Sequence, residues 1–267
     1  MVDLRKKPYY LSDEQIQWVE ETIASMSMEE KIGQLFVNMV HDRSPEALKE
    51  VVETYHPGAI RYQNAPADVL YEQNRILQET SRIPLLIASN CEHGGNGGVG
   101  GGTPMANGAA IAATGSEEVA YEAAKVSAAE GCAVGCNWNF APIVDLTYNW
   151  RNTIVQLRAF NDNPDDVIRF AKAFFKGTKT QNMATCMKHF PGDGTEENDQ
   201  HLIMGVNEMS CTEWDATFGK VYQELIDEGV MTIMAGHIAL PAYSRKLRPG
   251  IKDEEIRPAT LAPELIT

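Results

Sequence analysis

The sequence predicts an α/β protein built on a parallel β-sheet. About six short apolar segments alternate with amphipathic helical segments along the 267 residues. Strands that alternate with helices pair in parallel, because each connection crosses back over the sheet. Hydrophobic residues form 43% of the chain, enough for a large core. We therefore expect one folded domain over residues 1–267 and not a disordered chain.

The helices are marked by capping residues and by apolar periodicity. Ser27 and Ser210 each precede a glutamate by three residues, which is the capping-box pattern. Pro45 and Pro164 each follow a Ser or Asn and fit the first helical position. Together these signals predict helices over residues 13–25, from 27, from 44, and over 67–81, 116–135, 163–181 and 210–229.

The strands are shorter apolar runs between these helices. We expect them within residues 34–40, 58–63, 84–90, 137–146, 184–190 and 230–237. Two architectures fit, an open doubly wound sheet and a (β/α)8 barrel. Only 267 − 237 = 30 residues follow His237, too few for two more units of the same length. Counting alone therefore favours the open sheet.

Charge and composition exclude several classes of function. Lys plus Arg is 23 and Asp plus Glu is 37, so the net charge is −14, whereas nucleic-acid binding needs a basic surface. No stretch has the roughly 18 apolar residues of a membrane span. The first ten residues lack the apolar core of a signal peptide. The five scattered cysteines fit reduced thiols, so we expect a cytoplasmic protein with no membrane or nucleic-acid partner.

Chemically useful side chains follow the predicted strands. Asn90 follows one strand, Lys188 and His189 end another, and His237 follows the last. In both architectures, functional groups gather at the carboxyl ends of parallel strands. We therefore expect these residues to bind substrate at one edge of the sheet. No spacing in the sequence predicts a metal site, since Cys132 and Cys136 lack further ligands nearby.

The loop after Lys188 and His189 carries a second signal. Asp199 precedes His201 by two residues, so its carboxylate can hydrogen-bond the imidazole ring and stabilise its cation. This makes His201 a candidate proton donor. A glycine-rich run over residues 92–104 offers a weaker alternative, a phosphate cradle, but no Gly-Lys-Ser/Thr follows it. A nucleotide-binding α/β domain is therefore kept as a remote alternative.

The segment from Lys188 to His201 resembles glycoside hydrolase family 3, in particular its β-N-acetylglucosaminidase branch. It reads Lys-His-Phe-Pro-Gly-x-Gly, four residues, then Asp-x-His. Further segments resemble the family in the same order along the chain: residues 28–35, 83–88, 139–145, 158–164, and 237 with 258–261. The resemblance thus covers nearly the whole sequence. It implies a (β/α)8 TIM-barrel fold, incomplete, with about six of eight units present, and so overrides the count-based preference.

The resemblance also implies an activity and a set of roles. Members of the family are retaining exo-β-glycosidases that cleave terminal β-N-acetylglucosaminides or related β-linked sugars through a covalent intermediate. His201 would be the general acid/base, tuned by Asp199. Lys188, His189 and Arg158 match positions that bind the hydroxyls of the sugar. The partner is therefore a carbohydrate, and no cofactor or metal is implied.

Two departures from the family pattern keep alternatives open. Asn90 stands where the family has an aspartate, which puts the sugar preference in question. The family's nucleophile lies in a Ser/Thr-Asp motif that would come after Thr267. We therefore expect that a further segment, or another chain in an oligomer, completes the barrel. The alternatives are a β-glycoside phosphorylase of the same family and a catalytically inactive carbohydrate-binding fragment.

Overall fold

The fold is a curled parallel sheet that forms an incomplete barrel. The structure is a computed structural model, which describes residues 2–266. Six parallel strands pair in the order β1-β2-β3-β4-β5-β7. Their bounds are β1 Val37–Met39, β2 Ala59–Arg61, β3 Leu86–Ser89, β4 Trp138–Asn139, β5 Ala184–Phe190 and β7 Thr232–Ala235.

This strand order decides between the two architectures. Each strand lies beside the preceding member of the series, whereas a doubly wound sheet reverses its order at a switch point. Since right-handed crossovers then place every helix on the same face, the sheet curls away from the helices. The chain forms an incomplete (β/α)8 barrel, and the open sheet favoured by counting is wrong. The count failed because this chain holds fewer than eight units.

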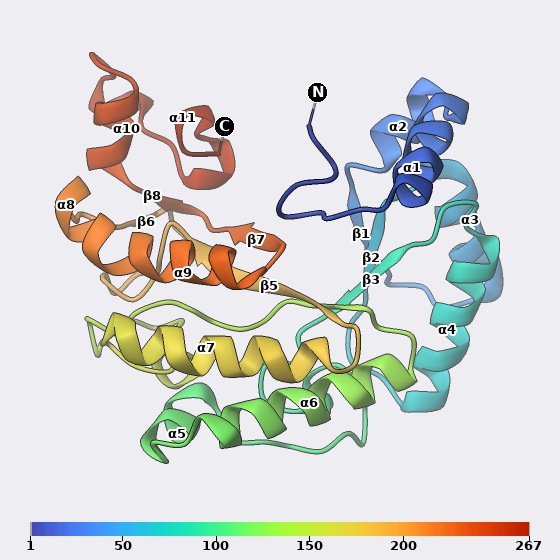
Figure 1. Ribbon diagram of the computed structural model, residues 1–267, viewed down its shortest axis with the longest axis horizontal. Helices are drawn as coiled ribbons and strands as arrows, with labels where there is room; N and C mark the ends of the chain where they lie inside the picture. Colours follow the sequence, from blue (N-terminus) through green and yellow to red (C-terminus); the bar gives the residue numbers. More distant parts are fainter. Residues whose placement is uncertain (1, 267) are drawn as a thin grey trace.

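The helices cover the outer face of this sheet. Figure 1 shows α3 and α4 outside β1–β3, and α6, α7 and α9 in succession around the remaining strands. The helices over the described residues are α1 Asp13–Ser25, α2 Met28–Gly33, α3 Pro45–Tyr55, α4 Ala67–Thr80, α5 Gly108–Ala113, α6 Glu117–Ala133, α7 Pro164–Lys179, α8 Cys211–Trp214, α9 Lys220–Glu228, α10 Pro241–Leu247 and α11 Pro263–Ile266. A π-helical turn, Asp215–Gly219, joins α8 to α9.

The predicted helix starts are confirmed because their signals are local. The side chain of Ser27 accepts the backbone N–H of Glu30, whose carboxylate accepts the N–H of Ser27 in return. Ser210 and Glu213 repeat this reciprocal pair at α8. Each pair satisfies two backbone N–H groups that a helix leaves unpaired at its first turn.

The core has two main parts, one for each half of the helical layer. One part packs α3 and α4 on the first three strands through Leu70, Leu77, Ile60 and Ile87. The other packs α6, α7 and α9 together through aromatic and aliphatic side chains that include Phe170, Phe174, Met187, Val221 and Leu225. The longest helices thus use one apolar stripe each and leave the carboxyl ends of the strands to polar residues.

A small second sheet was not predicted from the sequence. β6 (Gly205–Val206) pairs in parallel with β8 (Ile238–Ala239). These strands are only two residues long, so they carry no detectable periodicity. They tie the loop after β5 to the segment after β7. The loop that carries Asp199 and His201 is thereby held over the carboxyl end of the barrel.

The two edge strands carry exposed apolar side chains. Val37 and Met39 on β1 are exposed, as is Ile233 on β7. Exposed apolar edges favour association with another strand or chain. Oligomerisation therefore stays a prediction. Among the described helices, none is both long and apolar enough to cross a bilayer.

Candidate active site

A cavity of about 300 Å³ opens at the carboxyl ends of the strands. It brings together residues from five strand ends and loops: Arg61, Asn90, Phe140, Arg158, Lys188, His189, Gln200, His201, Met234, Ala235, Gly236 and His237. Six of the seven residues predicted as a site line this cavity. The seventh, Asp199, contacts His201 directly.

Lys188 and Arg158 share one carboxylate. The Nζ of Lys188 lies 2.6 Å from Oε1 of Glu92, and the guanidinium of Arg158 donates to both oxygens of Glu92 at 3.0 and 3.1 Å. The side chain of Lys188 is 2% exposed and that of Glu92 is 10% exposed. Burial by itself raises the pKa of Glu92, but the two cations outweigh it and lower the pKa to about 2. Glu92 therefore fixes both cations in the cavity.

His189 is oriented by a buried carboxylate. Its Nδ1 lies 2.7 Å from Oδ2 of Asp145, and its backbone N–H donates to Oδ1 of Asp145 at 3.1 Å. The backbone N–H of Asp193 also donates to this oxygen, at 2.8 Å. Because a carboxylate accepts only, Nδ1 carries the proton and Nε2 is left to accept from a ligand. Asp145 holds the turn after β5 together and does not itself line the cavity.

A second buried carboxylate connects the loop to the last strand. Asp193 accepts the side-chain amides of Asn152 and Gln200, at 2.8 and 2.7 Å. Gln200 in turn accepts the backbone N–H of His237 at 2.8 Å. Burial, together with the charge of Asp145, raises the pKa of Asp193. This chain of hydrogen bonds sets the position of the residue immediately before His201.

His201 and Asp199 form a solvent-facing pair at the mouth of the cavity. The Nδ1 of His201 and its backbone N–H lie 2.7 and 2.8 Å from Oδ1 of Asp199. The side chain of His201 is 65% exposed. The carboxylate fixes the proton on Nδ1, so Nε2 is the atom that faces incoming or departing groups. Asp199 therefore orients the ring of His201 at the mouth of the cavity.

Asn90 presents an unused acceptor. Its Oδ1 is buried and has no hydrogen-bond partner within residues 2–266. Burying such an atom without a partner costs about 1–3 kcal/mol, which a ligand hydroxyl would recover. The glycine-rich loop packs against the backbone here, and a Cβ on Gly97 would lie 2.2 Å from the carbonyl oxygen of Asn90. The glycines thus allow close approach of the loop to β3.

The lining of the cavity is cationic. Arg61, Arg158 and Lys188 contribute cationic side chains, and three imidazoles lie among them. No carboxylate belongs to that lining, because the acidic groups lie behind the residues that they orient. Among residues 2–266, no group of three or more His, Cys, Asp or Glu side chains is arranged to hold a metal ion. The arrangement suits a neutral polyhydroxylated ligand and an anion.

Sequence reasoning missed three residues of this site. Arg61 ends β2, and the rule that found the other strand-end residues would also have found it. Glu92 was visible as a strand-end carboxylate, but its contact with Lys188 spans 96 residues of sequence. Gln200 carried no signal of its own, since a glutamine in a polar loop is common.

Comparison with known proteins identifies the family. Residues 27–267 match the model of the glycosyl hydrolase family 3 N-terminal domain. The chain belongs to glycoside hydrolase family 3. This agrees with the strand order and with the motif from Lys188 to His201.

Individual relatives refine this comparison. A β-N-acetylglucosaminidase/β-glucosidase of Cellulomonas fimi is 41% identical over 266 residues, covering 100% of this chain and 47% of the relative. A β-hexosaminidase of Neisseria meningitidis serogroup C is 33% identical over 135 residues, 50% of this chain and 37% of the relative. The solved structure of a β-glucoside phosphorylase superposes with a TM-score of 0.95 at 43% identity, over 98% of this chain and 47% of that one. The chain thus spans about half the length of the Cellulomonas fimi relative and of the phosphorylase.

Proposed function

We propose that this chain supplies the sugar-binding and acid/base half of a retaining β-glycoside-cleaving enzyme. The substrate would be a terminal β-N-acetylglucosaminide or a related β-linked sugar such as a β-glucoside. The observation that carries this proposal is that Lys188, Arg158 and His201 line one cavity, although they come from a strand, a 3₁₀ turn and a loop. Family membership and the names of the relatives support it.

The proposed roles follow from the contacts of each residue. Lys188 and Arg158 are held by Glu92 and donate to sugar hydroxyls. The unpartnered Oδ1 of Asn90 accepts from a hydroxyl, and Nε2 of His189 accepts from another. His237 also lines the cavity. Fixed donors and acceptors of this kind recognise a polyhydroxylated ring by orientation.

The proposed cleavage uses the dyad for proton transfer. His201 donates a proton to the glycosidic oxygen as the bond to the anomeric carbon breaks. A carboxylate nucleophile, which the family carries in a Ser/Thr-Asp motif, would form the glycosyl–enzyme bond. For hydrolysis, His201 then takes a proton from water, which attacks the anomeric carbon. Asp199 orients the ring and stabilises its cation in both steps.

The dependence on the leaving group tests the role of His201. We expect His201→Ala in the full-length protein to slow cleavage of alkyl β-N-acetylglucosaminides by at least about 100-fold. Nitrophenyl glycosides, whose leaving group needs no proton, should be slowed much less. His56→Ala, at the opposite end of the barrel, is the matched control. Equal loss on both substrate types would contradict an acid role.

A second candidate function is phosphorolysis, in which phosphate accepts the glycosyl group. The carboxylate-free lining of the cavity favours it, because an acidic acid/base residue would repel an anionic acceptor. The similarity to a β-glucoside phosphorylase supports it. Product analysis in phosphate buffer separates the two functions, since sugar 1-phosphate forms only by phosphorolysis.

Two further proposals have separate tests. If the protein is an inactive carbohydrate-binding relative, sugar would bind in a manner dependent on Lys188 and Arg158 without turnover by the full-length chain.

A cytoplasmic location is supported by the cysteines, all five of which are free thiols. Fractionation of the source cells would test that location.

A further inference from the structure

Arg61 is the cation of the cavity for which the mechanism above has no use. It is the last residue of β2 and lines the same cavity as His201 and His237. In sheet order β2 lies three places from β5, the strand that leads into the His201 loop. Arg61 therefore enters the cavity from a different part of the sheet than the acid/base pair.

The charge balance of the lining singles out this residue. Lys188 and Arg158 are both paired with Glu92. His201 has its own carboxylate in Asp199. Within residues 2–266, the guanidinium of Arg61 has no carboxylate partner. Its side-chain contact is the thioether sulfur of Met39 at 3.8 Å, a weak acceptor. Its positive charge is therefore uncompensated.

An uncompensated guanidinium is unusual in a chain of net charge −14. Thirty-seven acidic residues are available, yet none of those described pairs with Arg61. A guanidinium offers parallel N–H donors that match two oxygens of a phosphate, and such charge-assisted contacts are stronger than neutral ones. A neutral sugar hydroxyl can accept from this guanidinium, but it offers neither the negative charge nor the paired oxygens of a phosphate. The ligand chemistry that fits Arg61 is thus a tetrahedral oxyanion.

We propose that Arg61 binds the inorganic phosphate that accepts the glycosyl group. The inference rests on the second candidate function, phosphorolysis, and names the residue that selects the acceptor. In that step a phosphate oxygen forms a bond to the anomeric carbon, and the bond from that carbon to the nucleophile carboxylate breaks. The carboxylate leaves with the electron pair. The β-linked sugar 1-phosphate is released, and no proton has to move when the dianion attacks.

The assignment separates two groups of cations by function. Lys188 and Arg158 share the single carboxylate of Glu92, which offsets part of their positive charge and occupies some of their donors. Arg61 keeps a full charge for the anion. His201, having given its proton to the leaving group, returns to neutral imidazole and does not repel phosphate. Water competes for the same intermediate but has no charge for Arg61 to attract.

Steady-state kinetics of the full-length protein test the proposal, with inorganic phosphate and a nitrophenyl β-glycoside as substrates. Arg61→Met should raise the KM for phosphate by roughly ten- to a hundredfold, the range for a lost hydrogen bond to a charged group. The KM for the glycoside should change far less. At fixed phosphate, the ratio of sugar 1-phosphate to free sugar should fall. Arg61→Lys, which keeps the charge but loses the paired donors, should lie between.

Arg75→Met is the matched control. Arg75 lies on α4, pairs with Glu72 and Glu79, and is far from the cavity in the fold. The variant removes the same net charge, so any general effect of charge on phosphate should appear in it. If Arg61→Met and Arg75→Met shift the KM for phosphate equally, the assignment of Arg61 is overturned.

The outcomes also separate this proposal from the function on which it rests. If the unaltered protein forms free sugar and no sugar 1-phosphate, phosphorolysis fails and the role of Arg61 fails with it. If sugar 1-phosphate forms but Arg61→Met and Arg61→Lys leave the KM for phosphate unchanged, only the role of Arg61 fails. Addition of guanidinium ion to Arg61→Ala should restore phosphate use, which a purely structural role would not predict.

Discussion

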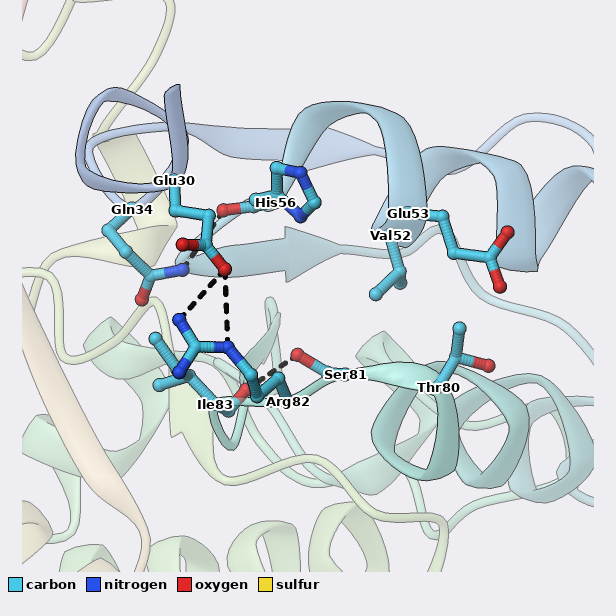
Figure 2. Close-up of a pocket in the computed structure, with 9 residues that line it drawn as sticks. All are labelled: Glu30, Gln34, Val52, Glu53, His56, Thr80, Ser81, Arg82 and Ile83. Atoms are coloured by element: carbon cyan, nitrogen blue, oxygen red, sulfur yellow. Dashed lines mark hydrogen bonds and ion pairs between the residues drawn. The ribbon is translucent and has the colours of Figure 1, made fainter. Parts of the chain in front are cut away.

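Two cavities lie at opposite ends of the strands and differ in how their charged side chains are paired. The amino-end cavity is lined by Glu30, Gln34, Val52, Glu53, His56, Thr80, Ser81, Arg82 and Ile83. Figure 2 shows Arg82 reaching across it to Glu30, while the amide of Gln34 donates to the carbonyl of His56. These contacts join α2, the end of α3 and the loop before β3. The polar side chains of Glu30, Gln34 and Arg82 thus already have partners within the protein.

The carboxyl-end cavity differs in two respects: its ion pair is more buried, and some of its polar groups lack a protein partner. Arg82 and Glu30 are 52% and 22% exposed, whereas Lys188 and Glu92 are 2% and 10% exposed. At the carboxyl end an acceptor on Asn90 and the charge of Arg61 have no protein partner within the described residues. Polar groups left unsatisfied at one end and satisfied at the other distinguish a binding site from a structural contact. The same division is general in barrels of this type.

The largest expected effect comes from removing the shared carboxylate. Glu92→Gln leaves two cations, one of them fully buried, without a negative partner, so the free energy of unfolding should fall by about 3–5 kcal/mol. Glu30→Gln, which breaks the more exposed pair at the other end, should cost far less, because water screens that pair. Urea denaturation of both variants measures the difference. Equal losses would mean that the two cavities do not differ as described.

The pH dependence of stability tests the contribution of the buried carboxylate of Glu92 separately. Because the folded pKa of Glu92 is lowered to about 2 from 4.5, its stabilisation is present above about pH 4.5 and is lost as the pH falls toward 2. The advantage of the unaltered protein over Glu92→Gln should therefore shrink by about 3 kcal/mol over that interval. Denaturation of both proteins at several pH values measures it. A constant difference down to pH 2 would contradict the lowered pKa.

Loss of the buried ammonium of Lys188 should lower activity on the glycoside by more than any loss of fold stability would explain. Lys188→Met in the full-length protein is expected to lower kcat/KM for the glycoside by about 100-fold, because charge-assisted hydrogen bonds to the sugar are lost. Lys176→Met removes an exposed lysine of α7 that pairs with Glu228 and serves as control. Comparable losses in both variants would argue against sugar binding by Lys188.

The smallest expected effect concerns the orienting carboxylate of the dyad. Asp199→Asn should lower kcat by about tenfold, because the amide oxygen still accepts from Nδ1 of His201 but no longer stabilises its cation. The exposure of the pair keeps the effect modest, since water screens it. Glu53→Gln, in the amino-end cavity, is the control. A kcat unchanged by Asp199→Asn would remove Asp199 from the proposed mechanism.

Much of the fold could be predicted because its signals are local. Capping boxes at Ser27 and Ser210 and prolines after Ser44 and Asn163 mark helix starts within four residues of sequence. All six sheet strands fall inside the predicted apolar segments. The short strands β6 and β8 were missed because two residues cannot show a period. Their pairing depends on segments more than thirty residues apart.

Part of the candidate site could also be predicted, because some of its residues stand directly at the ends of the predicted strands. Asn90, Lys188, His189 and His237 are found by position alone, since the ends of parallel strands meet at one edge. Arg158 was found only through resemblance, because it lies on a 3₁₀ turn between β4 and α7. No rule based on spacing places such a residue in a cavity.

The sequence by itself determined the alternation of strands and helices, the motif from Lys188 to His201, and the family that it resembles. Only the tertiary structure decided that Lys188 and Arg158 share Glu92 and that Arg61 has no carboxylate partner within residues 2–266. Helix caps and apolar runs act between neighbours in the chain, so they can be read along it. Charge balance in a cavity depends on distances between residues that are far apart in sequence, and folding alone sets those distances.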